Sequence, residues 1–244
     1  MDHWDFVVIG AGAAGFFGAI ACAEARPSSK VLLLEATART LTKVKISGGG
    51  RCNVTHQQFE AKQLVKNYPR GQKELLGPFH RFQPQDTVAW FANHGVQLKT
   101  EKDGRMFPTT NHSQTIIDCL ETAANHSGVH LQKNTMVKQI IPCTDGYEIH
   151  VKNGSILKAR YVLLATGSMP YGVSLAAALE HRIVSPVPSL FTFQINHPLI
   201  EGLPGISFPS AHVTLKIEGT TDVFMQQGPC LITHWGLSGP AVLK

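Results

Sequence analysis

The first 35 residues alternate between apolar runs and turn-forming residues. The apolar run Asp5–Ile9 predicts a buried parallel strand. The Ala-rich segment Ala13–Ala25 has no internal proline and predicts a helix. After a break at residues 26–29, the run Lys30–Glu35 predicts a second buried strand. This strand–helix–strand order over about 30 residues is typical of one βαβ unit of a Rossmann-type α/β fold.

Helical and polar segments follow this unit. Residues 36–56 are polar and rich in glycine, and we expect them to form a loop. Residues 73–94 predict a helix that is interrupted near Pro84. Ser113–His126 carries apolar residues on one face and predicts a further helix. Short strands are expected at residues 96–100 and 129–131.

A strand-rich stretch then ends the first domain. Three β-type segments are present: Met136–Ile141, Tyr147–Lys152 and Ser155–Lys158. The turn signals Asp-Gly at 145–146 and Asn-Gly at 153–154 separate them, which predicts an antiparallel meander. The apolar run Tyr161–Ala165, which leads into Thr166 and Gly167, predicts a return to the parallel sheet.

The sequence pattern changes after Pro186, where strand-like segments alternate with Pro and Gly turns. Leu190–Asn196 and Ala211–Glu218 are the expected strands of this region. We therefore predict a Rossmann-type nucleotide-binding domain over 1–188. Residues 189–244 would form the first part of an inserted β-rich substrate domain.

Composition and charge narrow the possible partners. The chain is 43% hydrophobic and 16% charged, a globular profile, with a net charge of +5. The Lys and Arg residues are scattered, so we expect no nucleic-acid partner. The five cysteines include no CxxC pair, which favours a reducing, cytoplasmic location. No apolar run approaches the ~20 residues of a membrane span, so no membrane partner is expected.

The motif Gly10-Ala-Gly-Ala-Ala-Gly15 is the first candidate for chemistry. It follows a predicted strand, opens a predicted helix, and precedes the acidic residue Glu35 at the end of the next strand. Gly10 permits a tight turn, Gly12 permits close approach of a pyrophosphate, and Gly15 permits close helix packing. The helix N-terminus attracts phosphate, and Glu35 is placed to bind ribose hydroxyls. The segment predicts a dinucleotide site.

The segments that follow favour FAD over a nicotinamide cofactor. A meander and then a strand that ends Ala165-Thr-Gly167 is the order expected of flavin-binding Rossmann proteins. No second GxGxxG motif lies between Gly167 and Lys244, so no separate nicotinamide-binding domain is predicted. NAD(P)H would then act only as a transient electron donor.

A second Gly-rich segment lies at residues 43–55, KVKISGGGRCNVT. Three consecutive glycines, Gly48–Gly50, expose backbone N–H groups that suit an anion. Ser47 adds a hydroxyl, and Lys43 and Arg51 add positive charge. We expect this segment to hold the flavin pyrophosphate from the flank opposite the first loop. Residue 57, five positions after Cys52, is Gln, so the dithiol of a flavin disulfide reductase is excluded.

These motifs resemble those of the bacterial HI0933-like, or BaiN-type, NAD(P)/FAD-dependent oxidoreductases. That family includes proteins described as aminoacetone oxidases and bile-acid-type enone reductases. The resemblance is carried by five segments: residues 10–15, 47–53, 104–108 (GRMFP), 165–168 (ATGS) and 233–240 (THWGLSGP). It implies an FAD lined by Lys43, Ser47, Gly48, Arg51, Cys52 and Asn53, with the backbone of Val137 at the adenine. Because the family's members are longer, it also implies that this chain is truncated at its C-terminus.

Motif and resemblance together give one set of candidate cofactor-binding residues and no catalytic residue or metal ligand. The set is Gly10, Gly12, Ala13, Ala14, Gly15, Glu35, Ala36, Lys43, Ser47, Gly48, Gly49, Gly50, Arg51, Cys52, Asn53, Val137, Ala165, Thr166 and Gly167.

The function expected from this set is that of an FAD-dependent oxidoreductase. It would transfer hydride between the flavin and a small organic substrate, with NAD(P)H or oxygen as the partner. Two alternatives remain open: an incomplete, non-catalytic FAD-binding fragment and, ranked lower, an RNA-modifying flavoprotein. The sequence leaves the oligomeric state undetermined.

Overall fold

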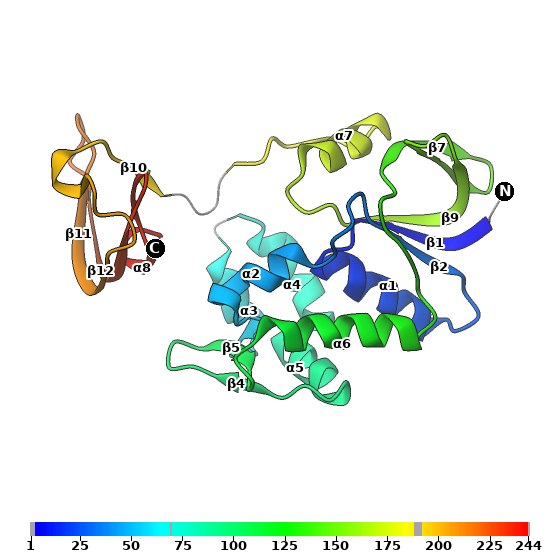
Figure 1. Cartoon of the computed structure of the whole chain (residues 1–244), viewed down its shortest axis with the longest axis horizontal. Helices are drawn as coiled ribbons and strands as arrows, with labels where there is room; N and C mark the ends of the chain where they lie inside the picture. Colours follow the sequence, from blue (N-terminus) through cyan, green and yellow to red (C-terminus); the bar gives the residue numbers. More distant parts are fainter. Residues whose placement is uncertain (1–2, 69, 188–191, 244) are drawn as a thin grey trace. The chain divides into compact units, whose positions relative to one another are not determined.

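The computed structural model describes residues 3–68, 70–187 and 192–243 (Figure 1). The chain divides into two compact units, residues 1–183 and 184–244, and each is considered by itself. The domain boundary expected near residue 188 lies outside the described residues.

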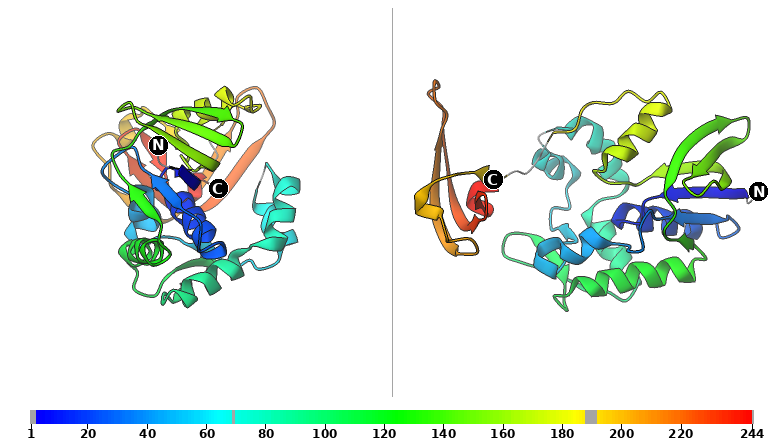
Figure 2. Two further views of the ribbon diagram at one scale, coloured as in Figure 1. Left: turned by 90° about the vertical axis from the view of Figure 1, so that its right-hand side faces the viewer. Right: turned by 45° about the horizontal axis from the view of Figure 1, so that its top comes forward.

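A six-stranded sheet organises the first unit, with the strand order β6-β2-β1-β9-β8-β7 (Figures 1 and 2). The strands are β1 (His3–Ile9), β2 (Val31–Leu34), β6 (His130–Gln132), β7 (Val137–Cys143), β8 (Gly146–Val151) and β9 (Ile156–Leu164). Pairing is parallel from β6 through β2 and β1 to β9, and antiparallel from β9 through β8 to β7. The Rossmann-type sheet and the meander predicted from the sequence are therefore confirmed, and they form one sheet.

Strand β9 differs from its prediction in one respect. The segments Ser155–Lys158 and Tyr161–Ala165 were expected as separate strands, but one continuous strand covers both. The reason is that no turn-forming residue interrupts them, and Leu157 and Ala159 are both buried. The first half of β9 pairs with β8, while nearly its whole length pairs with β1.

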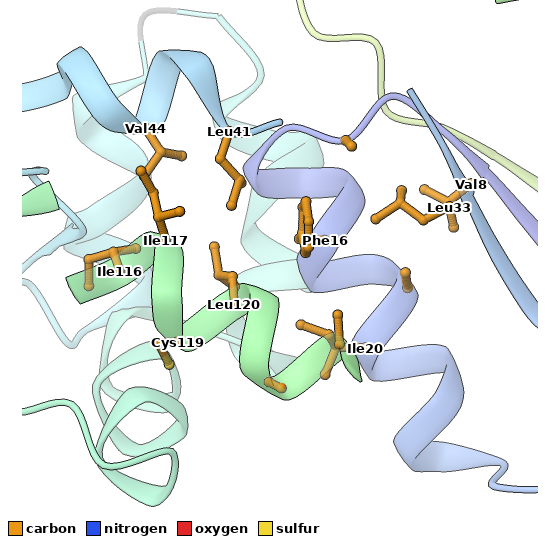
Figure 3. Packing of buried hydrophobic residues seen from close by; sticks show 14 of the residues in the cluster. Val8, Phe16, Ile20, Leu33, Leu41, Val44, Ile116, Ile117, Cys119 and Leu120 are labelled. Atoms are coloured by element: carbon orange, nitrogen blue, oxygen red, sulfur yellow. The ribbon is translucent and has the colours of Figure 1, made fainter. Parts of the chain in front are cut away.

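One face of the sheet packs against α1 (Ala13–Ala25) and α6 (Ser113–His126). Figure 3 shows the side chains of this layer, with Val8 and Leu33 from the strands facing Phe16 and Ile20 of α1. Leu120 of α6 completes the contact with the same cluster. The apolar stripe predicted for residues 113–126 is thus the face that α6 buries.

The opposite face is covered by the meander itself and by α7 (Pro170–Ala178). Val7 and Leu32 of the central strands share a buried cluster with Ile140 and Ile149 of the meander. Leu175 of α7 joins this cluster. Alternate residues of the short central strands therefore fill two cores, which explains their uninterrupted apolar sequence.

The loop expected over residues 36–56 contains a helix, α2 (Thr42–Gly50). The prediction was wrong here because Leu41 and Val44 are spaced so that both reach the α1–α6 core. Ser113 of α6 also donates its hydroxyl to the Lys45 carbonyl at 2.7 Å. The helical conformation ends at Ser47, whose backbone is extended, with φ −62° and ψ 147°.

Short helices and a small sheet lie between α2 and α6. The helices are α3 (Ala61–Leu64), the 3-10 helix η1 (Val65–Asn67), α4 (Gln72–Arg81) and α5 (Pro84–Asn93). Pro84 occupies the first turn of α5, so the predicted interruption near this residue is confirmed. The strands β3 (Thr55–His56), β4 (Leu98–Thr100) and β5 (Arg105–Pro108) form an antiparallel sheet in the order β3-β5-β4.

The second unit is a four-stranded antiparallel sheet in the order β10-β13-β12-β11. Its elements are β10 (Phe193–Gln194), η2 (Pro198–Ile200), β11 (Ser207–Lys216), β12 (Val223–Thr233), β13 (Gly236–Ser238) and α8 (Pro240–Leu243). The expected strand Leu190–Asn196 is observed as the shorter β10, and its first two residues lie outside the described residues. The β-rich character expected of this region is confirmed.

Candidate dinucleotide site

A tight turn joins β1 to α1 and carries the first glycine motif. The N–H of Gly10 donates to the Leu34 carbonyl at 2.8 Å, which fixes the turn to β2. A Cβ at position 15 would lie 1.8 Å from the Gly10 carbonyl oxygen, so only glycine permits this helix–turn contact. Gly12 is the N-cap of α1, and no atom lies within 4 Å of where its Cβ would be. The N-terminus of α1 is therefore open to a ligand on the side of Gly12.

Glu35 connects the end of β2 to this turn. Its Oε2 accepts from the N–H of Ala11 at 3.1 Å, and its Oε1 accepts from both the N–H and the hydroxyl of Thr37 at 2.9 Å. Oε1 therefore uses both of its lone pairs, whereas Oε2 keeps one for a further donor. Glu35 thus holds the turn and retains acceptor capacity toward a ligand.

A cavity of about 160 Å³, here cavity A, lies where β1 and β2 end and β7 begins, near α7. Tyr171 of α7 closes part of it by donating its hydroxyl to the Val137 and Lys138 carbonyls at 2.6 and 2.8 Å. Glu35 and Gly10 lie on its wall. The full lining is Ile9, Gly10, Leu34, Glu35, Ala36, Thr135, Met136, Val137, Thr166, Met169, Tyr171 and Gly172.

A larger cavity of about 510 Å³, cavity B, begins at the first turn of α1. Most of its polar residues come from α2 and the segment after it, with Thr87 from α5, and most of its apolar wall comes from α1, α5 and α6. Lys43 borders this cavity, and its ammonium donates to the Ser168 hydroxyl at 3.0 Å. The full lining is Ala13, Ala14, Phe17, Lys43, Val44, Ser47, Cys52, Asn53, Val54, Phe82, Thr87, Phe91, Ile116 and Leu120.

The three consecutive glycines all have left-handed backbones, with φ between 56° and 85°. A side chain at Gly48 would meet the Asn53 nitrogen and the Phe107 ring, both at 2.9 Å, whereas Gly49 and Gly50 face open space. Backbone N–H groups in such a turn suit an anion.

Cys52 ends the glycine turn and is also left-handed, with φ 62°. Burial raises the pKa of its thiol, and a hydrogen bond with Ser47 offsets part of that rise. Cys52 is therefore a packed, protonated thiol at neutral pH and is not activated as a nucleophile.

Arg51 contacts the β4–β5 hairpin. Its guanidinium forms an ion pair with Glu101 at 2.5 Å and lies 4.1 Å from the centre of the Phe107 ring. Arg105 approaches the same carboxylate at 3.7 Å and the same ring at 5.5 Å. The charge expected to contribute to phosphate binding is thus compensated by the β4–β5 hairpin.

The candidate residues divide into three groups. Cavity A has the first group on its wall: Gly10, Glu35, Ala36, Val137 and Thr166. Cavity B has the second: Ala13, Ala14, Lys43, Ser47, Cys52 and Asn53. The remaining candidates border neither cavity: Gly12, Gly15, Gly48, Gly49, Gly50, Arg51, Ala165 and Gly167.

Sequence reasoning missed the tyrosine in cavity A and the aromatic wall of cavity B. Tyr171 lies four residues after Gly167, and its position next to that motif was the available signal. Phe17 comes from α1 and Phe91 from α5, while Phe82 directly follows α4, and no local pattern connects the three. Within the described ranges, no group of three or more His, Cys, Asp or Glu side chains is placed to hold a metal ion. None of the described helices is both long and apolar enough to cross a membrane.

The chain is similar in fold to solved structures and similar in sequence to curated proteins. The 3-ketosteroid-delta4-(5alpha)-dehydrogenase of Rhodococcus jostii RHA1 aligns with a TM-score of 0.53 at 18% identity, over 72% of this chain and 48% of that one. The ribosomal RNA dihydrouridine synthase of Escherichia coli (strain K12) is 29% identical over 255 residues, which cover 100% of this chain and 60% of that protein. The 3-dehydro-bile acid delta(4,6)-reductase of Clostridium scindens is 25% identical over 97% of this chain and 58% of that protein.

The chain spans about three fifths of the length of these curated relatives. The family assignment rests on a broader match, because the family model for the HI0933-like protein Rossmann domain matches residues 4–237. The resemblance seen in the motifs is confirmed, and the chain belongs to the HI0933-like Rossmann-domain family.

Proposed function

We propose that this chain binds FAD across cavities A and B and is the cofactor-binding part of a flavoprotein oxidoreductase. One observation carries the proposal: the turn at the N-terminus of α1 borders both cavities, with Gly10 on cavity A and Ala13 and Ala14 on cavity B. A ligand that fills both must be long and must carry its negative charge near the middle, beside the helix N-terminus. FAD, with a diphosphate between two ring systems, has this form.

The adenosine half fits cavity A. Oε2 of Glu35 can still accept from a ribose hydroxyl, and the open space at Gly12 leaves room for the diphosphate. Val137 and Thr166 complete this end of the proposed site. A 2′-phosphate on the ribose would lie against the Glu35 carboxylate, so the site favours the unphosphorylated ribose.

The flavin half fits cavity B. Lys43, Ser47 and Asn53 provide polar groups at its border, and Phe17 and Phe91 provide an apolar wall. When bound, the flavin supplies hydride chemistry, while the protein supplies position and electrostatics. Among the residues that border neither cavity, we assign the open glycines 49 and 50 to the phosphate side and Arg51 to the support of the loop.

The test is a titration of the 244-residue chain with FAD, in which quenching of the flavin fluorescence reports binding. We expect saturable binding, competition by ADP, and weaker binding of FMN, which lacks the adenosine half. The absence of FAD binding, or equal binding of FMN and FAD, would contradict the proposal.

Two substrate classes remain for the oxidoreductase. A small organic substrate is supported by the relative named as a bile acid reductase. A pyrimidine base in ribosomal RNA is supported by the 29% identity, along the whole chain, to a ribosomal RNA dihydrouridine synthase. Dihydrouridine formation in RNA and reduction of a steroid enone, each measured with NADH and with NADPH, separate the two classes.

The alternative is a chain that binds FAD without catalysing a reaction by itself. An FAD complex whose absorbance does not bleach with NADH or NADPH would support this alternative and contradict a direct donor role for either nucleotide. Oxygen consumption by a substrate-reduced complex is the corresponding test for an oxidase. We also propose the cytoplasm as the compartment, supported by the five free cysteines.

A further inference from the structure

A segment with a net positive charge adjoins the proposed cofactor site. Residues 60–82, here the α3–α4 segment, carry five Lys or Arg residues against two Glu residues. The five are Lys62, Lys66, Arg70, Lys73 and Arg81. All five are exposed, and none forms an ion pair with any residue in the described part of the chain. In the sequence these charges are spaced apart, and the segment that carries them folds mainly as three consecutive short helices, α3, η1 and α4 (Figure 2, left, cyan).

A third cavity, cavity C, of about 470 Å³, adjoins this segment. Tyr68, Phe79 and Phe82 lie on its wall, and the rings of Tyr68 and Phe79 are 5.6 Å apart. Tyr68 and Phe82 are also partly open to solvent, at 38% and 42% exposure. Cavity C therefore offers aromatic faces next to a surface of uncompensated positive charge.

Cavity C also adjoins the site proposed for the flavin. Asn53, Val54, Phe82 and Thr87 line both cavity B and cavity C. A planar group held against the aromatic wall of cavity C would thus be separated from cavity B only by these shared residues. A nucleic-acid base could therefore lie in cavity C, next to the proposed flavin site, while its phosphates stay on the outer surface.

We propose that the α3–α4 segment binds the phosphate backbone of single-stranded RNA and that cavity C receives one of its bases. This inference rests on the oxidoreductase function proposed above and selects RNA as its substrate class. Basic side chains combined with aromatic faces are the general requirement for binding single-stranded nucleic acid. An anionic membrane or an acidic protein would use the charge but would have no need of an aromatic cavity.

The test measures fluorescence anisotropy of a labelled single-stranded RNA of about 12 nucleotides with the 244-residue chain over a range of salt concentrations. One variant carries Lys66→Gln, Lys73→Gln and Arg81→Gln. Its matched control carries Lys30→Gln, Lys102→Gln and Lys152→Gln, which removes the same charge from exposed positions elsewhere in the first unit. Loss of three phosphate contacts should weaken binding by at least about tenfold and reduce the salt slope by about 2. The control should bind as the unaltered chain does.

A second pair of variants tests the aromatic wall. Tyr68→Ala should weaken RNA binding several-fold without changing the salt slope, and Tyr68→Phe should retain the affinity, because stacking needs the ring and not the hydroxyl.

Three results would overturn the inference: no RNA binding by the unaltered chain, equal loss in the two triple variants, or equal binding of polyglutamate or of phosphatidylserine vesicles. FAD titration of every variant keeps the two proposals apart. If the unaltered chain binds FAD but not RNA, only this inference is refuted. If the unaltered chain does not bind FAD, the proposed function is refuted.

Discussion

The Glu35 carboxylate accepts a hydrogen bond from the backbone N–H of Ala11, at 3.1 Å, across 24 residues of sequence. The bond joins the end of β2 to the turn that opens α1. Glu35 thereby fixes the turn, and it also borders cavity A. One side chain is used both for folding and for the proposed ribose contact.

Replacement of this carboxylate should affect both properties. Glu35→Ala leaves the Ala11 and Thr37 donors without their acceptor, so we expect the free energy of unfolding to fall by roughly 1–3 kcal/mol. The Kd for FAD should rise by about tenfold or more, because ribose bonds to a charged acceptor are lost. Urea denaturation and FAD titration measure the two effects. The control is Thr37→Val, which removes the hydroxyl contacts with Glu35 and Arg39 but keeps the carboxylate, and should leave FAD affinity close to the original. Equal FAD affinity in Glu35→Ala and the unaltered chain would remove Glu35 from the proposed site.

Substitutions at Gly12 and Gly15 should have different effects, one on FAD affinity and the other on stability. Gly15→Ala places a Cβ 1.8 Å from the Gly10 carbonyl oxygen, and we expect a loss of at least about 1–3 kcal/mol in stability. Gly12→Ala meets no atom within 4 Å, so its stability should stay within about 1 kcal/mol of the original. Its FAD affinity should nevertheless fall, since the added methyl group occupies the approach of the diphosphate. Unchanged FAD affinity in Gly12→Ala would place the diphosphate elsewhere.

Lys43 should contribute to FAD binding and Arg51 to stability, although both were expected at the phosphate. Lys43 contacts the Ser168 hydroxyl and forms no ion pair in the described ranges, so its charge is available to a ligand. Lys43→Met should raise the Kd for FAD several-fold, reduce its salt dependence and leave stability unchanged. Arg51→Met should instead lower stability by about 1 kcal/mol, through loss of the Glu101 pair and the Phe107 contact, with little effect on FAD. FAD titrations at two salt concentrations and urea denaturation measure these effects. Weaker FAD binding in Arg51→Met, with no change in Lys43→Met, would place Arg51 at the cofactor instead.

The buried thiol of Cys119 should make stability depend on alkaline pH. Burial raises its pKa to about 11, from an ordinary value of about 9. The folded state then holds the proton more tightly than the unfolded state does, so the stabilisation is complete below pH 9 and is lost as the pH rises toward 11. We expect a loss of roughly 2–3 kcal/mol across this range. Urea denaturation at several pH values measures it, and Cys119→Ala should show a shallower decline. A decline equally steep in Cys119→Ala would assign the effect to other groups.

Local pattern predicted the individual strands of the central sheet, the meander and the α1 turn because each of these elements is marked by residues close together in sequence. The apolar runs around Val8 and Leu33 and the turn signals near Gly146 and Gly154 were sufficient for these elements. Helix α2 was not predicted, because only Leu41 and Val44 mark it and their burial depends on α6, about 70 residues later.

The candidate site was predicted in part for the same reason. The turn at Gly10 and the acceptor Glu35 belong to one local unit, and the structure brings them together at cavity A. Arg51 could not be placed from sequence, because its partner Glu101 lies 50 residues away on the β4–β5 hairpin. Charge on a glycine-rich segment indicates an anion site only when no carboxylate reaches it first.

Strand β9 has a mechanical consequence. It is hydrogen-bonded to β1 along one edge and to β8 along the other, and it ends at Leu164, directly before Ala165-Thr166-Gly167. Ala165 in turn donates its N–H to the Ile9 carbonyl, one residue before the Gly10 turn. The meander, the Gly10 turn and the segment 165–167 are therefore all tied to β9. None of them can move away from the others without breaking hydrogen bonds of this strand. We expect their amides to exchange with solvent as one cooperative unit, so that ligand bound at the turn would slow exchange as far away as β8.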